Sequence, residues 1–597
     1  MTIETVWVPQ DVASNWGYVS EVTEPTHLRP VNSDVSSLMA ADAAPHIDSS
    51  AGEMVIAYHE RTKHHYHRFA ASLGFMDWAT QLDPFRRYQG APNVALALPK
   101  ERSAISYWQL YIPPATHPTP LTIDSISVFF RYALSLTAWK RAGESSWALR
   151  ANPSSGNLHP TEGYALLPAI GELGAAPGVY HYAPEPHGFE RRADVDASVW
   201  SAMTAGLQTG SFFVGLSSIY GRESWKYGER AFRYCQHDVG HAIGTLRFAA
   251  ASLGWGLRVL DRVDEVEVAR LLGLDRDEDF EGAERENPEL IALVGPEAER
   301  DARQLNHSVR QTKATSWYGK ANALSRGRGA AWPVIDEVAR ATSNSRLAVD
   351  EDLSGYSSER GIFQSPVRSG SKSAESVILG RRSAVSMDAS TSISAATFFR
   401  MLGRLVQTRS GHSVPWDAIA WRPRIHLGLF VHRVDGLPSG LYALARDPEK
   451  VDELRTAMRR DFLWRQPVAC PRDLPLFLLE KGDFGSLATQ ISCGQGIAGD
   501  GAFSLGMIAD FMGSLVSRGT GFYRNLFWEA GLVGQVLYLE AEEAGIRGTG
   551  IGCYFDDAVH DVFGITSRDW QSLYHFTVGG PMEDNRLTTL PAYRRER

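Results

Sequence analysis

The chain has 597 residues, 44% hydrophobic and 22% charged, which is typical of a folded globular protein and too long for one ordinary core. Its net charge of −9 argues against nucleic acid as a main partner. Apolar runs stay shorter than the ~18–20 residues of a membrane-spanning helix, and the N-terminus lacks the basic and apolar regions of a signal peptide. We therefore expect a cytoplasmic protein with no membrane partner.

The composition shifts along the chain and predicts two domains. Residues 1–57 are polar and mixed, which indicates an irregular leader. Residues 302–373 are rich in Ser, Arg, Gly and Ala and have little periodicity, so we interpret them as a linker that is partly ordered around 331–342. The linker would separate a first domain, 58–301, from a second domain, 374–597.

The first domain opens with a histidine cluster, His59, His64, His65 and His67. A metal site needs convergent ligands, and only Glu60 accompanies these side chains. We expect the cluster to serve in packing or partner contact, and we predict no metal.

The two halves of the chain repeat one another. Three pairs of segments recur in the same order: SVFFR at 127–131 with ATFFR at 396–400, Gly178–Tyr180 with Gly440–Tyr442, and a helix bracketed by Gly240 and Gly254 with one bracketed by Gly531 and Gly545. This order predicts an internal duplication and a pseudo-symmetric pair of domains, the fused equivalent of a two-fold dimer. In the second helix, Glu540, Glu542 and Glu543 indicate a solvent-exposed stripe.

Strands and helices alternate irregularly, which favours an α+β fold. The apolar stretch 126–139 is helix-like. The segments predicted as strands are 163–168, 178–182, 256–260, 291–295, 424–432, 440–444, 475–480 and 572–579.

Residues 150–162 (RANPSSGNLHPTE) form a polar turn between the helix-like stretch and the first strand. The proline fixes φ, the glycine permits positive φ, and the serines and asparagines supply hydrogen-bond donors. Such a loop can bring backbone N–H groups close to a flat polar ligand. Composition alone is also compatible with a solvent-facing turn.

Two further motifs lie in the second domain. Arg381, Arg382 and Ser383 make a natural phosphate clamp, although an isolated motif of this kind is often a solvated basic patch. The glycines of RGTGIGCYFDD, at 547–557, allow the backbone to approach a ligand closely. They follow a helix and therefore do not form a dinucleotide-binding fingerprint.

Candidate proton-transfer and nucleophilic groups are few. Lys226 and Tyr227 place an ammonium beside a phenol, a pair that can shuttle a proton; the alternative is a surface lysine beside a half-buried tyrosine. The four cysteines show no C-x-x-C spacing, and the sequence places no base to activate Cys553.

Together these motifs resemble the nitroreductase superfamily of flavoproteins and, within it, the SagB-type dehydrogenases, over about 120–300 and 370–595. The resemblance implies two tandem nitroreductase-like domains, each a mixed sheet wrapped by helices, that form an intramolecular pseudo-dimer. It implies FMN as cofactor, bound by Arg150, Pro153, Ser154, Ser155, Gly156, Asn157, Arg381, Arg382, Ser383, Gly550, Ile551, Gly552 and Arg586. Lys226 and Tyr227 match the catalytic pair of azoline dehydrogenases in this group.

Each domain holds only part of the motif set. The first domain has the turn but no clamp, and the second has the clamp but no Ser-Ser-Gly in its equivalent segment, 421–427. In homodimeric relatives each FMN takes the clamp from one subunit and the turn from the other. The resemblance therefore implies one composite FMN site between the domains.

The function implied by the resemblance is that of an FMN-dependent oxidoreductase with hydride transfer at flavin N5, dehydrogenating a peptide or natural-product intermediate. The alternatives are an NAD(P)H-dependent nitro or quinone reductase and a catalytically degenerate binding or scaffold protein of the same fold. Whether Lys226 and Tyr227 face the retained FMN site stays open at this point.

Overall fold

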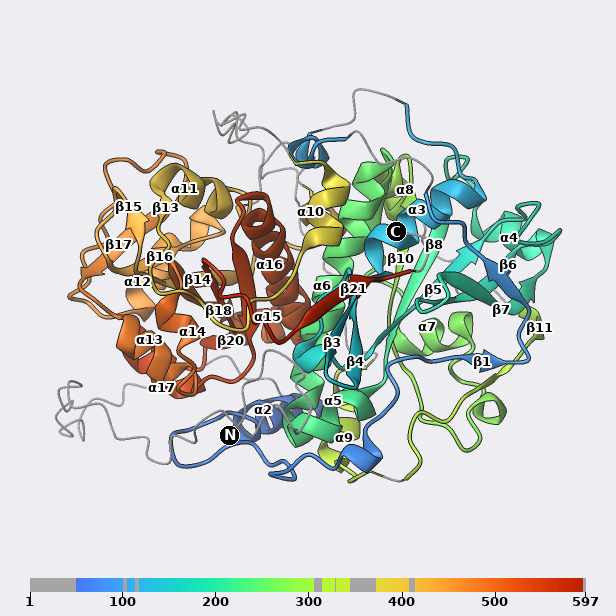
Figure 1. Cartoon of the computed structure of the whole chain (residues 1–597), viewed down its shortest axis with the longest axis horizontal. Coiled ribbons are helices and arrows are strands. Elements are labelled where there is room, and N and C mark those ends of the chain that lie inside the picture. Colours follow the sequence, from blue (N-terminus) through green and yellow to red (C-terminus); the bar gives the residue numbers. More distant parts are fainter. Residues whose placement is uncertain are drawn as a thin grey trace.

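The structure is a computed structural model that describes residues 50–99, 105–112, 117–304, 314–327, 329–343, 372–406 and 414–593. Most of the predicted leader and large parts of the predicted linker lie outside these residues. Two β-sheets lie on opposite sides of a pair of long central helices (Figure 1). No helix in the described ranges is long and apolar enough to cross a membrane.

The two large sheets have the same strand order. In the first domain the order is β11-β7-β6-β5-β8-β10-β9, with β2 also paired to β7. In the second it is β17-β16-β14-β18-β20-β19. The strands of the first sheet are β2 (Asn93–Ala95), β5 (Thr161–Leu167), β6 (Gly178–Ala183), β7 (Gly188–Val195), β8 (Phe212–Ser218), β9 (Gly256–Val259), β10 (Asn287–Gly295) and β11 (Ala314–Trp317). Those of the second are β14 (Ile425–Val431), β16 (Gly440–Leu444), β17 (Leu476–Lys481), β18 (Phe503–Asp510), β19 (Arg547–Ile551) and β20 (Trp570–Gly579).

The strand pairings correct one detail of the predicted fold. The sequence implied mixed sheets, but neighbouring strands in both large sheets are antiparallel. Strands β6 and β7 are joined by only a few residues, and a connection that short permits only antiparallel pairing. The α+β class with two tandem domains is confirmed.

The central helices α6 (Ala231–Ser252) and α16 (Phe522–Glu543) are each 22 residues long and buried along almost their whole length. The backbones of the two helices come into contact at one glycine of each helix. A Cβ added to Gly240 would lie 2.2 Å from the carbonyl oxygen of Trp528, and one added to Gly531 would lie 2.2 Å from that of His237. The helices therefore cross with their backbones in contact, and one hydrophobic core runs through both domains.

Equivalent ion pairs lie on the two sides of this helix crossing. Arg233 of α6 reaches the second domain and pairs with Asp556 at 2.9 Å. Its counterpart Arg524 of α16 reaches the first domain and pairs with Glu289 at 2.9 Å. The two domains thus pack as a pseudo-dimer within one chain.

The remaining elements surround these sheets. The first domain and the segment after it hold α3 (Ile123–Ala133), α4 (Ala197–Met203), α5 (Tyr220–Tyr227), α7 (Glu265–Leu272), α8 (Ala298–Gln304), α9 (Pro333–Ala341), β1 (Tyr88–Gln89) and β12 (Lys320–Ala321). The second domain holds α10 (Ala374–Gly380), α11 (Ala395–Gly403), α12 (Val451–Ala457), α13 (Gly485–Ile491), α14 (Ile497–Asp500), α15 (Phe511–Arg518), α17 (Asp556–Phe563), β13 (Ile393–Ser394) and β15 (Val434–Asp435).

Both ends of the described chain cross to the opposite domain. Strand β21 (Thr588–Pro591) adds to β3 (Leu136–Ala142) and β4 (Ser145–Arg150) in a three-stranded sheet, and Figure 1 shows it reaching over from the second domain. At the other end, α2 (Ser50–Arg61) leads to Lys63, which pairs with Asp557 of the second domain at 3.0 Å. This exchange ties the two domains together at the sides of the central helices.

Three sequence predictions differ from the structure. The predicted linker contributes β11 to the first sheet, so that domain extends beyond 301. The helix-like stretch 126–139 ends as a helix at Ala133 and continues as β3, whose partner β21 is far away in the sequence. The glutamates of α16 are not an exposed stripe, because Glu540 is buried and pairs with Arg400 of α11 at 3.0 Å.

Candidate functional site

The polar turn is anchored to the central helix α6. Its residues 155–157 form a short 3-10 helix with Gly156 and Asn157 at positive φ, where glycine is favoured. The buried carboxylate of Asp238 accepts hydrogen bonds from the backbone N–H and the hydroxyl of Ser155, both at 3.0 Å. Burial raises the pKa of Asp238 to about 7, although the hydrogen bonds from the serines oppose this shift.

The predicted clamp lies directly against the base of this turn. Arg381 follows α10 and donates hydrogen bonds to the carbonyl oxygens of Arg150, at 2.9 Å, and Ala151, at 3.3 Å. Arg382 donates to the hydroxyl of Thr137 at 3.2 Å. The structure therefore brings together two motifs that are about 230 residues apart in the sequence and belong to different domains.

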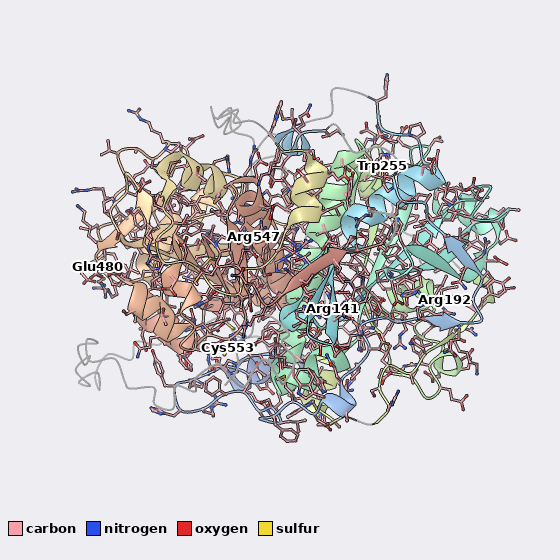
Figure 2. All side chains as sticks on the ribbon, viewed as in Figure 1. Arg141, Arg192, Trp255, Glu480, Arg547 and Cys553 are labelled. Atoms are coloured by element: carbon pink, nitrogen blue, oxygen red, sulfur yellow. The ribbon has the colours of Figure 1, made fainter. Side chains whose placement is uncertain are left out.

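A cavity of about 330 Å³ opens between the turn and the clamp. Both domains line it, through Lys140, Trp147, Leu149, Arg150, Asn152, Pro153, Ser154, Asn157, His159, Gly380, Arg381, Arg382, Ser383, Ala384, Val385, Arg547, Pro581, Met582, Glu583, Asp584, Leu587 and Thr589. The three-stranded sheet of β21, β3 and β4 forms part of this wall. Figure 2 shows Arg547 in the middle of the molecule, where the two halves meet.

Several basic side chains line the cavity, and burial disfavours their charged forms. Burial, and then the neighbouring charges of Arg381 and Arg547, lower the pKa of Arg382 to about 10. Burial also lowers the pKa of Arg150 to about 10 and, together with Arg382, lowers that of Lys140. An anion in the cavity would relieve this repulsion, because a negative charge stabilises the charged form of each group. The donor set fits a phosphate group.

A smaller hollow of about 30 Å³ adjoins the cavity and shares Pro153, Ser154 and Ser383 with it. Its other lining residues are mostly aromatic or small: Ser155, Gly156, Tyr227, Tyr234, Asp238, His241, Tyr538, Thr549, Gly550, Gly552 and Tyr574. The hydroxyl of Ser383 lies 2.9 Å from that of Tyr538, so clamp and hollow are directly connected.

The Lys–Tyr pair at the end of α5 lies at this hollow. Tyr227 is among its lining residues, and a Cβ added to Gly156 would lie 2.5 Å from the Tyr227 hydroxyl and 3.3 Å from Lys226 Nζ. The ammonium of Lys226 stands 5.0 Å from the centre of the Tyr227 ring. The pair therefore faces the composite site that contains turn and clamp.

Phe522 and Tyr523 of the second domain are not the counterpart of this pair, because α5 corresponds to α15, which ends at Arg518. Tyr523 instead corresponds to Phe232, on which it stacks in the core.

The glycine-rich segment meets aromatic side chains. A Cβ added to Gly550 would lie 1.8 Å from the Tyr574 hydroxyl, and one added to Gly552 would lie 2.1 Å from the Tyr234 ring. Both glycines line the hollow, but close packing of these tyrosines already requires them. Ile551 was predicted to bind the cofactor, yet its side chain lies in the core of the second domain because alternate residues of β19 face opposite sides.

Arg586 does not line the cavity. Its guanidinium pairs with Asp584 through two hydrogen bonds of 2.9 and 2.8 Å at the protein surface. The basic residues found in the cavity wall instead are Lys140 and Arg547, which the sequence analysis missed. Arg547 directly precedes the glycine-rich segment, so the sequence could have indicated it. Lys140 lies beside no such motif, and only the position of β3 in the fold brings it to the cavity.

The histidine cluster contributes to packing between the domains. His59 is buried beside Tyr523, and its Nε2 lies 3.2 Å from the side-chain oxygen of Gln571. His64 Nδ1 accepts a hydrogen bond from the N–H of Ala70 at 2.9 Å. Within the described residues, no group of three His, Cys, Asp or Glu side chains is placed to hold a metal ion.

Comparisons with known proteins agree with this architecture. The model of the nitroreductase family matches residues 141–283 and 483–580, one segment in each domain. A protein of Methanocaldococcus jannaschii, named as a candidate nitroreductase, is 27% identical over 188 residues, which are 30% of this chain and 84% of the relative.

A solved structure shares the whole tandem fold. It is that of a candidate nitroreductase from Anabaena variabilis, with a TM-score of 0.63 and 20% identity, and the likeness covers 89% of this chain and 99% of that one. The family model thus matches one segment in each domain, and this solved structure shares the fold of two domains in one chain.

Proposed function

We propose that this chain is an FMN-dependent oxidoreductase with a single FMN site between its two domains. The observation that carries the proposal is the cavity of about 330 Å³, which is lined by the turn of the first domain and the clamp of the second. Neither domain supplies both parts. The site is therefore complete only in the packed pair.

The residues present fit the two ends of such a cofactor. Arg382, Arg547 and Lys140 would hold the phosphate, since guanidinium and ammonium groups bind phosphate oxygens strongly. The turn residues Ser154 and Asn157 offer polar groups on the opposite wall. When bound, FMN would supply a hydride acceptor at its N5 atom.

The Lys–Tyr pair would supply the proton chemistry. Tyr227 lies at the hollow next to the cavity, and the Lys226 ammonium stands beside its ring. A positive charge near a phenol stabilises the negative charge that its oxygen gains on losing a proton. The pair can thus remove a proton from a substrate, which favours dehydrogenation of a peptide or natural-product intermediate.

The test of the cofactor assignment is the visible spectrum of the purified protein. A flavin band near ~450 nm is expected at about one flavin per chain. Arg382→Gln in the second domain and Lys140→Gln in the first should each weaken FMN binding by about 10- to 100-fold, because a charge-assisted hydrogen bond contributes ~1.5–3 kcal/mol. Arg586→Gln is the matched control and should leave binding unchanged.

The stoichiometry decides the composite arrangement. Two flavins per chain would overturn the single site, and equal loss of flavin in the Arg586→Gln variant would overturn the assignment of the cavity. A protein that neither purifies with flavin nor takes up added FMN would indicate the binding or scaffold alternative.

An NAD(P)H-dependent nitro or quinone reductase is the second candidate, and the names of the two relatives favour it. Anaerobic mixing with NADPH separates the two functions. A bound flavin that bleaches within the dead time of manual mixing would support the reductase, and a flavin that stays oxidised would support the dehydrogenase.

A further inference from the structure

Two cysteines that lie 60 residues apart in the sequence meet beside the candidate site. The Sγ atoms of Cys493 and Cys553 are 2.6 Å apart. Both side chains are half-buried, whereas Cys235 and Cys470 are buried elsewhere in the structure. Figure 2 labels Cys553 below Arg547. No C-x-x-C spacing marks this pair in the sequence, because the two cysteines come together only when the chain folds.

Hydrogen bonds between the two loops hold the thiols together. The side-chain amide of Gln495 donates to the carbonyl oxygens of Ser492 and Cys553, both at 3.0 Å. The N–H of Phe555 donates to the carbonyl oxygen of Ile491 at 2.8 Å. The loop after α13 is therefore fixed against the segment after β19, and each loop presents one cysteine to the other.

A buried cation lies next to the pair. The guanidinium of Arg230 donates to the carbonyl oxygen of Gly552 at 3.2 Å, one residue before Cys553. Asp556 pairs with the same guanidinium at 3.1 Å, and Tyr66 packs near Cys493. The guanidinium attracts a negative charge on Cys553, the thiolate form that attacks disulfides, and the Asp556 carboxylate offsets part of this attraction.

We propose that Cys493 and Cys553 form a redox-active dithiol whose oxidant is a low-molecular-weight disulfide. One thiolate attacks a sulfur of the small disulfide, forms a mixed disulfide and releases one small thiol. The second thiolate then attacks the protein sulfur of the mixed disulfide and releases the second small thiol. The protein loses two electrons and two protons, and the small disulfide gains them. This reaction requires no flavin and goes beyond the proposed function.

Oxidation would join two parts of the second domain covalently. The bond would link the loop after α13 to the segment that contains Gly550 and Gly552, which line the small hollow. The oxidation state of the dithiol would thereby be coupled to the mobility of the glycine-rich wall of the site.

The experiment uses the full chain and glutathione disulfide as the probe. After incubation under native conditions, the number of free thiols titrated in denaturant should fall from four to two per chain. Mass spectrometry of a non-reducing digest should find one Cys493–Cys553 linkage. Cys235 and Cys470 are internal controls and should stay reduced, because both are buried.

The Cys493→Ser variant separates an exchange reaction from chance oxidation. It should accumulate one mixed disulfide with glutathione at Cys553, because the resolving thiol is missing. Retention of four free thiols in the wild type would overturn the proposal. So would a glutathione adduct on each cysteine without the internal linkage, or a linkage between two chains.

Discussion

At the scale of single residues, Asp238 and Glu529 occupy equivalent positions on the two central helices. Each carboxylate accepts hydrogen bonds from the backbone of the loop that faces it, Asp238 from Ser155 and Glu529 from Arg424 and Ile425. Arg446 neutralises Glu529 in an ion pair. Asp238 has no ion pair of this kind among the described residues. The turn of the candidate site is thus held by a buried carboxyl that titrates near neutrality.

Asp238 should make stability fall as pH rises. Its pKa in the folded protein is about 7, above the ~3.8 of an exposed aspartate, so the folded state binds more protons between these values. The free energy of unfolding should therefore decrease from pH ~4 to ~7 and then level off. Asp238→Asn, which mimics the protonated acid, should remove this slope. Thermal unfolding of both proteins between pH 5 and 8 checks the effect, and parallel curves would contradict it.

On the function proposed above, Lys226→Ala and Tyr227→Phe should each abolish turnover and leave FMN bound, because the pair lies at the hollow and not in the basic wall. A thiazoline-containing peptide is a suitable probe, since its dehydrogenation lowers its mass by two hydrogens. Lys320→Ala changes an exposed lysine on another surface and serves as control. Full activity in both variants would discard the proton-transfer role.

At the scale of elements, a buried charge network joins three strands of the first sheet. His181 on β6 lies between Glu190 on β7, at 2.9 Å, and Glu162 on β5, at 3.1 Å. Burial alone would lower the pKa of His181, but the hydrogen bonds to both glutamates outweigh it and raise the pKa to about 9. Arg222 of α5 completes the network by pairing with Glu162 at 2.5 Å.

The network should stabilise the protein most below neutral pH. The folded pKa of His181 lies above the ~6.5 of the unfolded chain, so its contribution is fully present below pH ~6.5 and is lost as pH rises through about 9. His181→Gln should cost ~3–5 kcal/mol at pH 6, because it removes the buried cation that lies between Glu162 and Glu190. Urea unfolding at pH 6 and pH 10 measures this.

The comparison variant for the histidine is His65→Gln, a more exposed position. It should unfold like the wild type at both pH values. A His181→Gln variant with the same pH dependence as the wild type would show that the histidine is not the titrating group.

At the scale of the whole molecule, the fold is a fused two-fold pair. The two large sheets share one strand order, and α6 and α16 cross with Gly240 and Gly531 in contact. The exchange of β21 and of the segment after α2 links the domains on either side. In the described part of the chain, the turn and the clamp each occur in one domain and together line one composite cavity.

Gly240→Ala should destabilise the pair of domains together. The added methyl group would lie 2.2 Å from a backbone carbonyl of α16, so the helices must separate. Overpacking of this kind typically costs ~1–3 kcal/mol or more. Gly171→Ala is the control, since a Cβ there meets nothing within 4 Å. The midpoint of urea unfolding checks the prediction, and equal midpoints for both variants would contradict it.

Local sequence patterns predicted much of the fold and part of the site. The predicted strands at 178–182 and 572–579 are present as β6 and β20. Strands β8 and β18 were missed, because every residue in them is buried and a continuous apolar run does not distinguish a strand from a helix. Glu540 of α16 was misplaced because its partner Arg400 is distant in the sequence.

The sequence by itself determined the α+β class, the duplication, and the separation of the turn and the clamp between two domains, since each depends on local composition or on the order of motifs. The tertiary structure alone decided which side chains converge. It brought Lys140 and Arg547 to the cavity and the Lys226–Tyr227 pair to the adjoining hollow, left Ile551 and Arg586 outside the cavity, and placed Cys493 against Cys553. The cavity depends on the crossing of α6 and α16 and on a strand exchanged between the domains, and the cysteine contact depends on loops 60 residues apart; no short-range pattern encodes such long-range packing.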